Sequence, residues 1–280
     1  MDEIGLVGSL WAPSQELAAL GASVSPFRSR LRLIAKVARH PGRALLRLVL
    51  WARLARLDPE QDRRRFLGWL SGELGVDAER LLTEYRSSAF RREYLARLAE
   101  LRSTAESRRL GTSDAWCLEA LYLLVRALRP RVVVETGVLY GASSAHILAA
   151  LEANGTGELY SVDLPRGPSE PAPGYLIPPH LRGRWTLVEG DSRRELPGLL
   201  ERLGGIDCFH HDSLHTREHM TWEYATALPR MRPGGVLATH DVLAPDGVRG
   251  IFRRNAFPDF CDRRGLRFAT FQNSGFARCS

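Results

Sequence analysis

The sequence has little lysine, few cysteines and no long apolar run. Lysine occurs once, at Lys36, although the 280 residues include 39 lysines and arginines together. The four cysteines show no C-x-x-C spacing, which argues against a zinc ribbon or a disulfide framework. No apolar stretch reaches bilayer length without charge, and the N-terminus lacks a basic region followed by an apolar core. These absences favour a cytoplasmic globular protein with free thiols.

The net charge of +7 is unevenly distributed. Residues 1–110 carry 20 Lys and Arg against 13 Asp and Glu, whereas residues 111–280 carry 19 of each. Within residues 28–57, which hold no acidic residue, the segment 44–57 predicts a helix with its arginines on one side and apolar residues elsewhere. We expect this helix to dock on the rest of the chain or on a dimer partner. Contact with an anionic membrane surface and binding of an acidic substrate are the alternatives, and basicity alone argues only weakly for nucleic acid.

The first 110 residues show helix-like segments without strand-like alternation. The expected helices include residues 64–70, a segment for which Asp77 is a possible cap, and residues 90–101. Gly111 marks the predicted boundary between a helical N-terminal region, 1–110, and an α/β domain, 111–280. The α/β domain begins with a helix that should end at Arg129-Pro130, because proline disfavours a helical residue before it.

Residues 131–144, RVVVETGVLYGASS, are typical of a strand, a glycine loop and the start of a helix. The β-branched run 132–134 predicts a buried parallel strand. Gly137 and Gly141 bracket the loop, which lets a ligand approach the backbone closely and meet the N–H groups of a helix N-terminus. The spacing G-x-x-x-G departs from the dinucleotide fingerprint G-x-G-x-x-G, so NAD and FAD are disfavoured.

The remaining pattern predicts a doubly wound α/β sheet. We expect further strands at 157–162, 185–189, 206–211 and 236–239, then a hairpin around Asn273-Ser274-Gly275, with Pro233-Gly234-Gly235 as a turn before the fifth strand. Six prolines in residues 165–184 should exclude a helix there. This long connection is a candidate substrate-binding loop at the carboxyl edge of the sheet.

Polar residues follow the predicted ends of the second and third strands. Asp163 ends the second strand, where a carboxylate can accept both ribose hydroxyls of an adenosine ligand. Asp191 and Ser192 follow the third strand and are candidates for the adenine edge. Capping of the next helix by either residue is an alternative compatible with that contact.

Histidines cluster near the ends of the fourth and fifth strands. Five of the eight histidines lie between residues 210 and 240. Asp212 follows the fourth strand, with His215 three residues further on, and His240 and Asp241 end the fifth strand. A neutral imidazole can accept a proton near pH 7, so His215 is the candidate general base and His211 the second choice. A capping or packing role for His215 remains the alternative.

The glycine loop, the GDS sequence at 190–192 and LPRMRPGGVLATHD at 228–241 resemble class I S-adenosylmethionine (SAM) dependent methyltransferases. The resemblance is to small-molecule O-methyltransferases of the cephalosporin-hydroxylase-like and sugar O-methyltransferase family, and more distantly to catechol O-methyltransferase. It covers residues 111–280 and implies a Rossmann-like, mostly parallel seven-stranded sheet with a C-terminal antiparallel hairpin. It also implies that SAM is held by Glu135, Thr136, Gly137, Gly141, Ser143, Asp163, Asp191, Ser192 and Asp212.

The same resemblance suggests catalytic residues and a metal. The catechol-type enzymes carry a basic residue at the position of His215. Asp212, His240 and Asp241 occupy the positions of metal ligands in metal-dependent relatives, which makes Mg²⁺ a candidate cofactor. His240 departs from that pattern, because a carboxylate is expected there. Without a metal, His240 becomes an alternative base oriented by Asp241.

The leading hypothesis is methyl transfer from SAM to a hydroxyl of a small molecule, such as a sugar or natural product. The enzyme alternative is a metal-independent N-methyltransferase. The other alternative is a SAM-fold protein that binds a membrane surface or nucleic acid through the basic helix in 28–57. In the methyltransferase reading, the resemblance implies that the N-terminal helices serve as a lid or as the interface of a homo-oligomer, and surface docking is the third role that we expect for this region.

Overall fold

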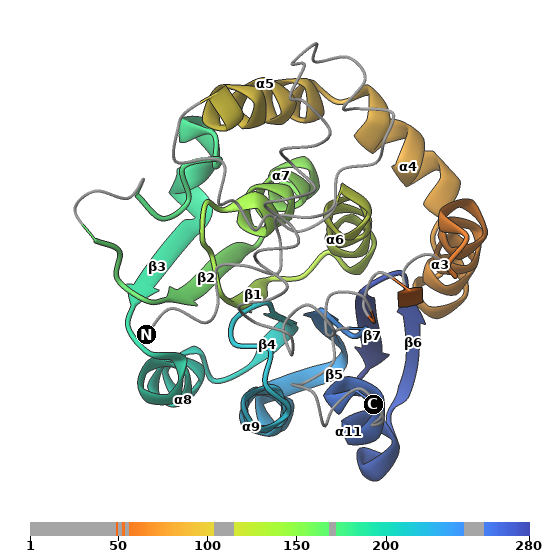
Figure 1. Cartoon of the computed structure of the whole chain (residues 1–280), viewed down its shortest axis with the longest axis vertical. Helices are drawn as coiled ribbons and strands as arrows, with labels where there is room; N and C mark the ends of the chain where they lie inside the picture. The colour runs from red at the N-terminus through yellow and green to blue at the C-terminus, as the bar shows by residue number, and fades with distance from the viewer. Residues whose placement is uncertain (1–48, 50–51, 54–55, 104–114, 168–171, 244–254) are drawn as a thin grey trace, which may run out of the picture.

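A computed structural model describes residues 49, 52–53, 56–103, 115–167, 172–243 and 255–280 of the chain, and it contains one seven-stranded sheet (Figure 1). The strands are β1 (Val132–Thr136), β2 (Glu158–Asp163), β3 (Trp185–Glu189), β4 (Ile206–His211), β5 (Met231–His240), β6 (Arg267–Phe271) and β7 (Ser274–Arg278). Their order is β3-β2-β1-β4-β5-β7-β6, and only β7 runs antiparallel to its neighbours. The predicted fold class is confirmed.

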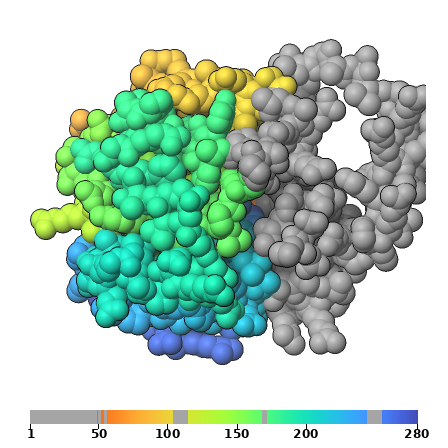
Figure 2. Space-filling view, turned by 90° about the vertical axis from the view of Figure 1, so that its left-hand side faces the viewer, coloured from red at the N-terminus to blue at the C-terminus, as the bar shows by residue number. Residues whose placement is uncertain are grey.

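Helices cover both faces of the sheet (Figure 1). They are α3 (Pro59–Leu74), α4 (Ala78–Ser87), α5 (Ala89–Ser103), α6 (Ala115–Leu128), α7 (Ala142–Asn154), α8 (Ser192–Leu203), α9 (Arg217–Ala227) and α11 (Ala256–Arg264). Alternate residues of a strand point to opposite faces, so Val133 and Cys208 pack in the core under α6 and α7, whereas Val134 and Phe209 pack under α8 and α9. Seen from the β3 side, α5 lies above and α11 below the sheet (Figure 2).

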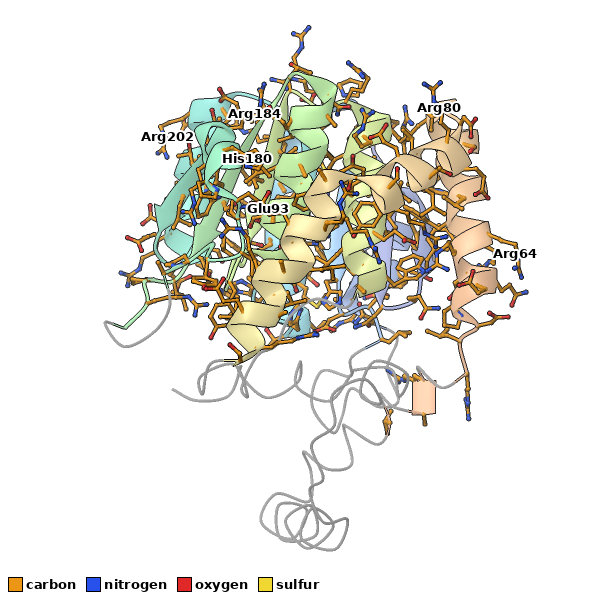
Figure 3. All side chains as sticks on the ribbon, turned by 90° about the horizontal axis from the view of Figure 1, so that it is seen from above. Arg64, Arg80, Glu93, His180, Arg184 and Arg202 are labelled. Atoms are coloured by element: carbon orange, nitrogen blue, oxygen red, sulfur yellow. The ribbon has the colours of Figure 1, made fainter. Side chains whose placement is uncertain are left out.

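The described N-terminal helices share a core with the sheet. Phe66 of α3 is 1% exposed, and its ring lies 5.3 Å from Phe271 and 5.2 Å from Phe276 of the C-terminal hairpin. The carboxylate of Asp62, also in α3, accepts hydrogen bonds from the backbone and side-chain nitrogens of Gln272. Polar side chains such as Arg64 and Arg80 point outward from α3 and α4 (Figure 3). These helices therefore cover apolar surface of the α/β sheet.

His146 joins α7 to the helices above it. Its Nε2 atom lies 3.0 Å from the hydroxyl of Tyr85, and its ring centroid lies 4.5 Å from Tyr94 and 5.0 Å from Phe90. Burial lowers the pKa of His146 to about 4, although the hydrogen bond to the Ala142 carbonyl opposes part of that shift. His146 is therefore neutral at physiological pH.

We expect His146 to make the protein less stable in mild acid. Below about pH 6.5 the unfolded chain binds a proton at this residue, whereas the native state does not until about pH 4. The free energy of unfolding should thus fall by up to about 3 kcal/mol across that interval. Urea denaturation at several pH values would measure the loss. The His146→Gln variant should lack this component, and a variant of the exposed His180, His180→Gln, should retain it.

The proline-rich connection differs from its prediction. Residues 179–184 form a short 3-10 helix, η4 (Pro179–Arg184), because prolines are tolerated at the first turn. Leu176 and Ile177 are fully buried in the core next to α7. The expectation that no helix forms is wrong, and the described part, 172–184, is anchored rather than structureless.

Two turns also differ from their predictions. Pro233 to Gly235 lie within β5 rather than in a turn before it, at a register shift against β4 where a proline is accommodated. The hairpin turns at Gln272 and Asn273, so Ser274 and Gly275 already belong to β7. Gln272 takes the left-handed conformation, with φ of 49°, that lets a two-residue turn close.

Two predictions fall on residues that the structure leaves undescribed. The basic segment 28–57 and the boundary at Gly111 lie outside the described residues, apart from a few positions after residue 48. Among the described helices, none combines the length and apolar character needed to cross a membrane. The domain division, the lid or interface role and the membrane contact stay predictions.

Candidate functional site

The carboxyl ends of the strands are linked by backbone hydrogen bonds. The Asp212 N–H donates to the Thr136 carbonyl at 2.9 Å, and the Gly137 N–H donates to the Val162 carbonyl at 2.9 Å. Gly137 has φ of 86°, and a Cβ atom at this position would lie 2.1 Å from the Asp212 carbonyl oxygen. Only glycine fits where these two backbone segments approach so closely. The glycine loop and the segment after β4 therefore contact each other directly.

Asp163 fixes the glycine loop. One oxygen of its carboxylate, Oδ2, accepts hydrogen bonds from the backbone nitrogens of Val138 at 3.2 Å and Leu139 at 2.8 Å. Its Oδ1 atom accepts from the backbone nitrogen of Leu164. A carboxylate has about four acceptor positions, so capacity remains for a ligand hydroxyl. Leu139 and Leu164, 38% and 55% exposed, provide apolar surface beside this carboxylate.

The segment 172–178 holds the other side of the glycine loop. The Gly174 N–H donates to the Leu139 carbonyl, and the Leu176 N–H donates to the Tyr140 carbonyl. Gly141 has φ of 80°, and a Cβ atom there would lie 2.7 Å from the Gly174 Cα atom. The proline-rich connection therefore contacts the loop that the sequence assigns to the cofactor.

Glu135 is fully buried on the α7 face of the sheet. Its Oε2 atom accepts from the hydroxyls of Ser144 at 2.6 Å and Ser161 at 3.0 Å. Its Oε1 atom has no hydrogen-bond partner in the described part of the chain and lies 3.5 Å from Nδ1 of His210. Ser143, the other predicted contact in this region, is buried in the first turn of α7.

Asp191, Ser192 and Thr136 are engaged in contacts within the protein. Asp191 is the N-cap of α8, because its Oδ1 atom accepts from the Arg193 backbone nitrogen. Ser192 lies with its hydroxyl 3.1 Å from Nε2 of His219. The Thr136 hydroxyl donates to Glu223 at 2.5 Å. The capping alternative is confirmed for Asp191, and the cofactor roles of all three residues stay predictions.

The structure brings together four predicted site residues from the ends of β4 and β5. Nε2 of His215 lies 3.5 Å from Asp212 Oδ1 and 3.3 Å from Asp241 Oδ2. Nδ1 of His240 lies 3.3 Å from Asp212 Oδ1 and 3.6 Å from Asp241 Oδ1. We call these four side chains the His-Asp cluster. The His215 side chain is 25% exposed, so a substrate can reach it.

The backbone of Asp241 supports the cluster. Asp241 has φ of 60°, which is uncommon for a residue other than glycine and is frequent at functional sites. Its side chain accepts a hydrogen bond from Asn273, and its carbonyl accepts one from Asn255 at 3.2 Å. The hairpin and the start of α11 thus fix the position of this carboxylate.

The two imidazoles keep Asp212 ionised. Burial alone would raise the pKa of the Asp212 carboxyl group, but the charge and hydrogen bond of His240 and the charge of His215 outweigh it and hold the pKa below its usual range. The carboxylate and imidazole atoms are suitable metal donors. Among the described residues, however, no three such side chains are arranged to hold a metal ion. As placed, the four side chains of the His-Asp cluster contact one another.

The residues at this edge fit SAM by charge. SAM carries a positive sulfonium and an ammonium group, and the edge offers the carboxylates of Asp163 and Asp212 and the unpartnered, buried Oε1 atom of Glu135. The apolar surface of Leu139 and Leu164 is suited to an adenine ring. A small polar ligand with an adenosine part therefore matches the site.

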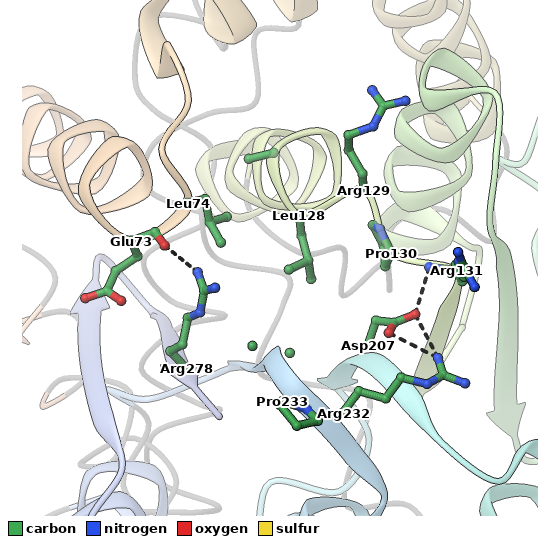
Figure 4. A pocket seen from close by; sticks show the side chains of 13 residues that line it. Glu73, Leu74, Leu128, Arg129, Pro130, Arg131, Asp207, Arg232, Pro233 and Arg278 are labelled. Carbon is green, nitrogen blue, oxygen red and sulfur yellow. Dashed lines mark hydrogen bonds and ion pairs between the residues drawn. The ribbon is translucent and has the colours of Figure 1, made fainter. Parts of the chain in front are cut away.

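A hollow lies at the opposite edge of the sheet (Figure 4). It has a volume of about 560 Å³, and the side chains of three of the four arginines that line it donate to protein groups. Arg278 donates to the Glu73 carbonyl, Arg232 to the Asp207 carboxylate, and Arg129 to the Asn154 carbonyl. These contacts explain the arginines structurally, so we place the functional site at the carboxyl edge.

Solved structures share this fold at low sequence identity. The O-methyltransferase TomG from Streptomyces achromogenes, involved in tomaymycin synthesis and solved with SAM, matches with a TM-score of 0.53 and 20% identity over 67% of this chain and 90% of its own. An O-methyltransferase from Bacillus cereus, in complex with SAH, gives 0.50 and 15% over 69% and 92%. An SAH-bound methyltransferase from Podospora anserina gives 0.50 and 14% over 67% and 88%. Comparison with curated proteins by sequence gives no match.

The strand order and the solved structures show the fold of class I SAM-dependent methyltransferases. Residues 134–242, from β1 to just beyond β5, match the family described as a methyltransferase domain. This match agrees with the resemblance that the motifs indicated. Because the sequence identities are low, the solved structures show the fold alone. The methyl acceptor has to be inferred from the site.

Glu223 is the main polar residue that the sequence argument missed. It is fully buried in α9 and accepts hydrogen bonds from side chains of β1, β4 and the loop between β4 and α9. The available signal was its position four residues after His219 on the same helix face as Met220 and Tyr224, both of which are buried. A glutamate on an apolar helix face needs buried partners.

Proposed function

We propose that the protein transfers the methyl group of SAM to a hydroxyl of a small molecule, such as a sugar or natural product. The observation that carries this proposal is the His-Asp cluster beside the glycine loop: a partly exposed imidazole with two carboxylates next to it. A deprotonated amine acceptor reacts without a base, whereas a hydroxyl acceptor reacts faster when a base removes its proton. The cluster therefore favours O-methylation over the N-methylation alternative.

The proposed roles follow from the contacts. SAM supplies a methyl group already activated on its sulfonium. Asp163 would bind the ribose hydroxyls, and Glu135, Ser143 and Asp212 would hold the methionine part. His215 would accept the acceptor's proton on the ring nitrogen that does not face the carboxylates, and Asp212 and Asp241 beside Nε2 would stabilise the imidazolium that forms.

Metal assistance is a second candidate because the carboxylates of Asp212 and Asp241 share the same imidazole partners. Mg²⁺ prefers oxygen ligands, so these two residues with His240 would be the ligands, and a bound ion would lower the acceptor's pKa. The carboxylates would have to part from the imidazoles to bind it. Loss of turnover in chelator and its recovery with added Mg²⁺ would support this form, whereas full turnover without metal would leave His215 or His240 as the base alone.

Binding of SAM is the first test of the proposed function. Calorimetry should detect binding of both SAM and its demethylated product, and Asp163→Ala should weaken both about tenfold or more, because it removes a charged acceptor of ribose hydroxyls and of the loop N–H groups. Asp207→Ala is the matched control. The Asp207 carboxylate also accepts from two backbone nitrogens, those of Arg131 and Val132, but at the opposite edge. Absence of binding by the wild-type protein would refute the proposal.

The non-enzymatic alternative is tested by salt dependence. Binding to duplex nucleic acid or anionic vesicles through the basic segment 28–57 would weaken steeply as salt increases. The charged groups of the carboxyl edge give no reason to expect such binding, so the small-molecule acceptor is the partner that we propose.

A further inference from the structure

Glu223 accepts hydrogen bonds from four elements at once. Its Oε2 atom lies 2.5 Å from the Thr136 hydroxyl and 2.6 Å from Nδ1 of His211. Its Oε1 atom lies 2.8 Å from Nε2 of His219 and 2.9 Å from the Ser213 hydroxyl. These four donors fill the usual acceptor positions of a carboxylate, although the side chain has no contact with water.

The charge on Glu223 is stable. Burial alone would raise the pKa of this carboxyl group, but hydrogen bonds from His211 and His219 outweigh the burial and hold the pKa below its usual range. An ionised acceptor-only carboxylate requires a proton on Nδ1 of His211 and on Nε2 of His219. Nδ1 of His219 is correspondingly free to accept from Arg193 Nε, at 3.5 Å. Glu223 thus sets the tautomers of both histidines.

The partners of Glu223 lead to both ends of the proposed cofactor site. Ser213 and His211 flank Asp212, which is proposed to hold the methionine part. On the other side, His219 contacts Ser192, the first residue of α8 after its cap Asp191, where the adenine edge is proposed. Glu223 itself lies in the second turn of α9, on the face of the sheet away from the glycine loop helix α7.

We propose that Glu223 is a positioning residue that sets the spacing between the two ends of the SAM site without touching SAM. Its carboxylate holds the segment after β4 and the N-terminus of α8 in one network, so a change at either end is transmitted to the other through His219 and Glu223. The inference rests on the proposed cofactor site. It assigns a role in cofactor affinity to a residue that no motif identifies.

The test is the affinity of Glu223→Gln for SAM by calorimetry. The variant keeps the shape but loses the charge, and one buried charged hydrogen bond corresponds to about a 10- to 100-fold increase in Kd. Tyr224→Phe is the matched control, because it removes one buried hydrogen bond, to Thr239 at 2.7 Å, from the same helix and keeps the ring that packs against His211. Its Kd should stay unchanged. ¹⁵N spectra of the imidazoles should show a tautomer change at His211 or His219 in Glu223→Gln only, because the glutamine amide offers an acceptor to one of them and a donor to the other.

A double-mutant cycle makes the test independent of how well Glu223→Gln folds. Ser192→Ala and Ser213→Ala each remove one contact at one end of the network. If Glu223 and His219 couple the ends, the two effects on SAM affinity should be non-additive. Additive effects, or a folded Glu223→Gln protein with wild-type affinity, would overturn the inference. A wild-type protein that does not bind SAM would instead refute the proposed function.

Discussion

We expect the His215→Asn variant to bind SAM as the wild type does and to transfer methyl groups about 100- to 10,000-fold more slowly, the usual contribution of a general base. His215 is the partly exposed imidazole of the His-Asp cluster, and its Nε2 atom lies between two carboxylates. These carboxylates would stabilise the imidazole ring once it is protonated. Asparagine keeps a polar side chain of similar size but cannot take a proton. The loss should therefore fall on kcat and leave the cofactor's Kd unchanged.

The measurement is release of demethylated cofactor with a panel of hydroxylated small molecules, followed by kinetics on the acceptor that the wild type uses. Arg64→Asn is the control, because Arg64 is exposed on α3, outside the proposed site. Wild-type turnover in His215→Asn would exclude this residue as the base. In that case His240→Asn should show the loss instead, since His240 contacts the same two carboxylates.

Replacing Gly137 with alanine should abolish measurable SAM binding and destabilise the fold by roughly 3 to 5 kcal/mol, the combined cost of a left-handed backbone and an overpacked site. The added Cβ atom would lie 2.1 Å from the Asp212 carbonyl oxygen, which is backbone and cannot rotate away. The glycine loop and the segment carrying Asp212 would have to separate. Both segments belong to the proposed cofactor site, so affinity and stability should fall together.

Gly155→Ala separates these two costs. Gly155 also has a positive φ, 71°, but no atom lies within 4 Å of the position of its Cβ. This variant should lose only about 1 to 2 kcal/mol of stability and bind SAM normally. Urea denaturation and calorimetry on both variants would decide. If Gly137→Ala and Gly155→Ala lose the same stability and bind SAM with the same affinity, the close contact between Gly137 and Asp212 would have no effect of its own.

Local signals in the sequence were sufficient for most of the sheet. The run Val132 to Val134 predicted β1, and the proline at 130 predicted the end of α6 at Leu128. The acids and histidines at strand ends were predictable as one site, because parallel strands with helical crossovers bring their carboxyl ends to a single edge. The contact between His215, Asp212 and Asp241 follows from that topology.

Other features depend on contacts that the sequence does not encode locally. Pro233 and Gly234 look like a turn, yet both lie in β5, where the Gly234 N–H donates to the carbonyl of Cys279, just after β7. The prolines of 178–179 look like breaks, yet they start η4 over a buried Ile177. The Glu223 network joins residues up to 87 positions apart, so only the folded chain reveals it.

The N-terminal helices and the sheet share one core, and this core limits where the chain can be cut and joined to another protein. Phe66 and Leu70 of α3 are buried against the same apolar cluster as Phe276 of β7 and Leu124 of α6. A fragment that begins at α6 would expose this apolar surface to water, which favours aggregation. We therefore expect any piece that moves between proteins as an independent module, by gene fusion or by exchange during evolution, to include α3, well before the first residue of the methyltransferase match.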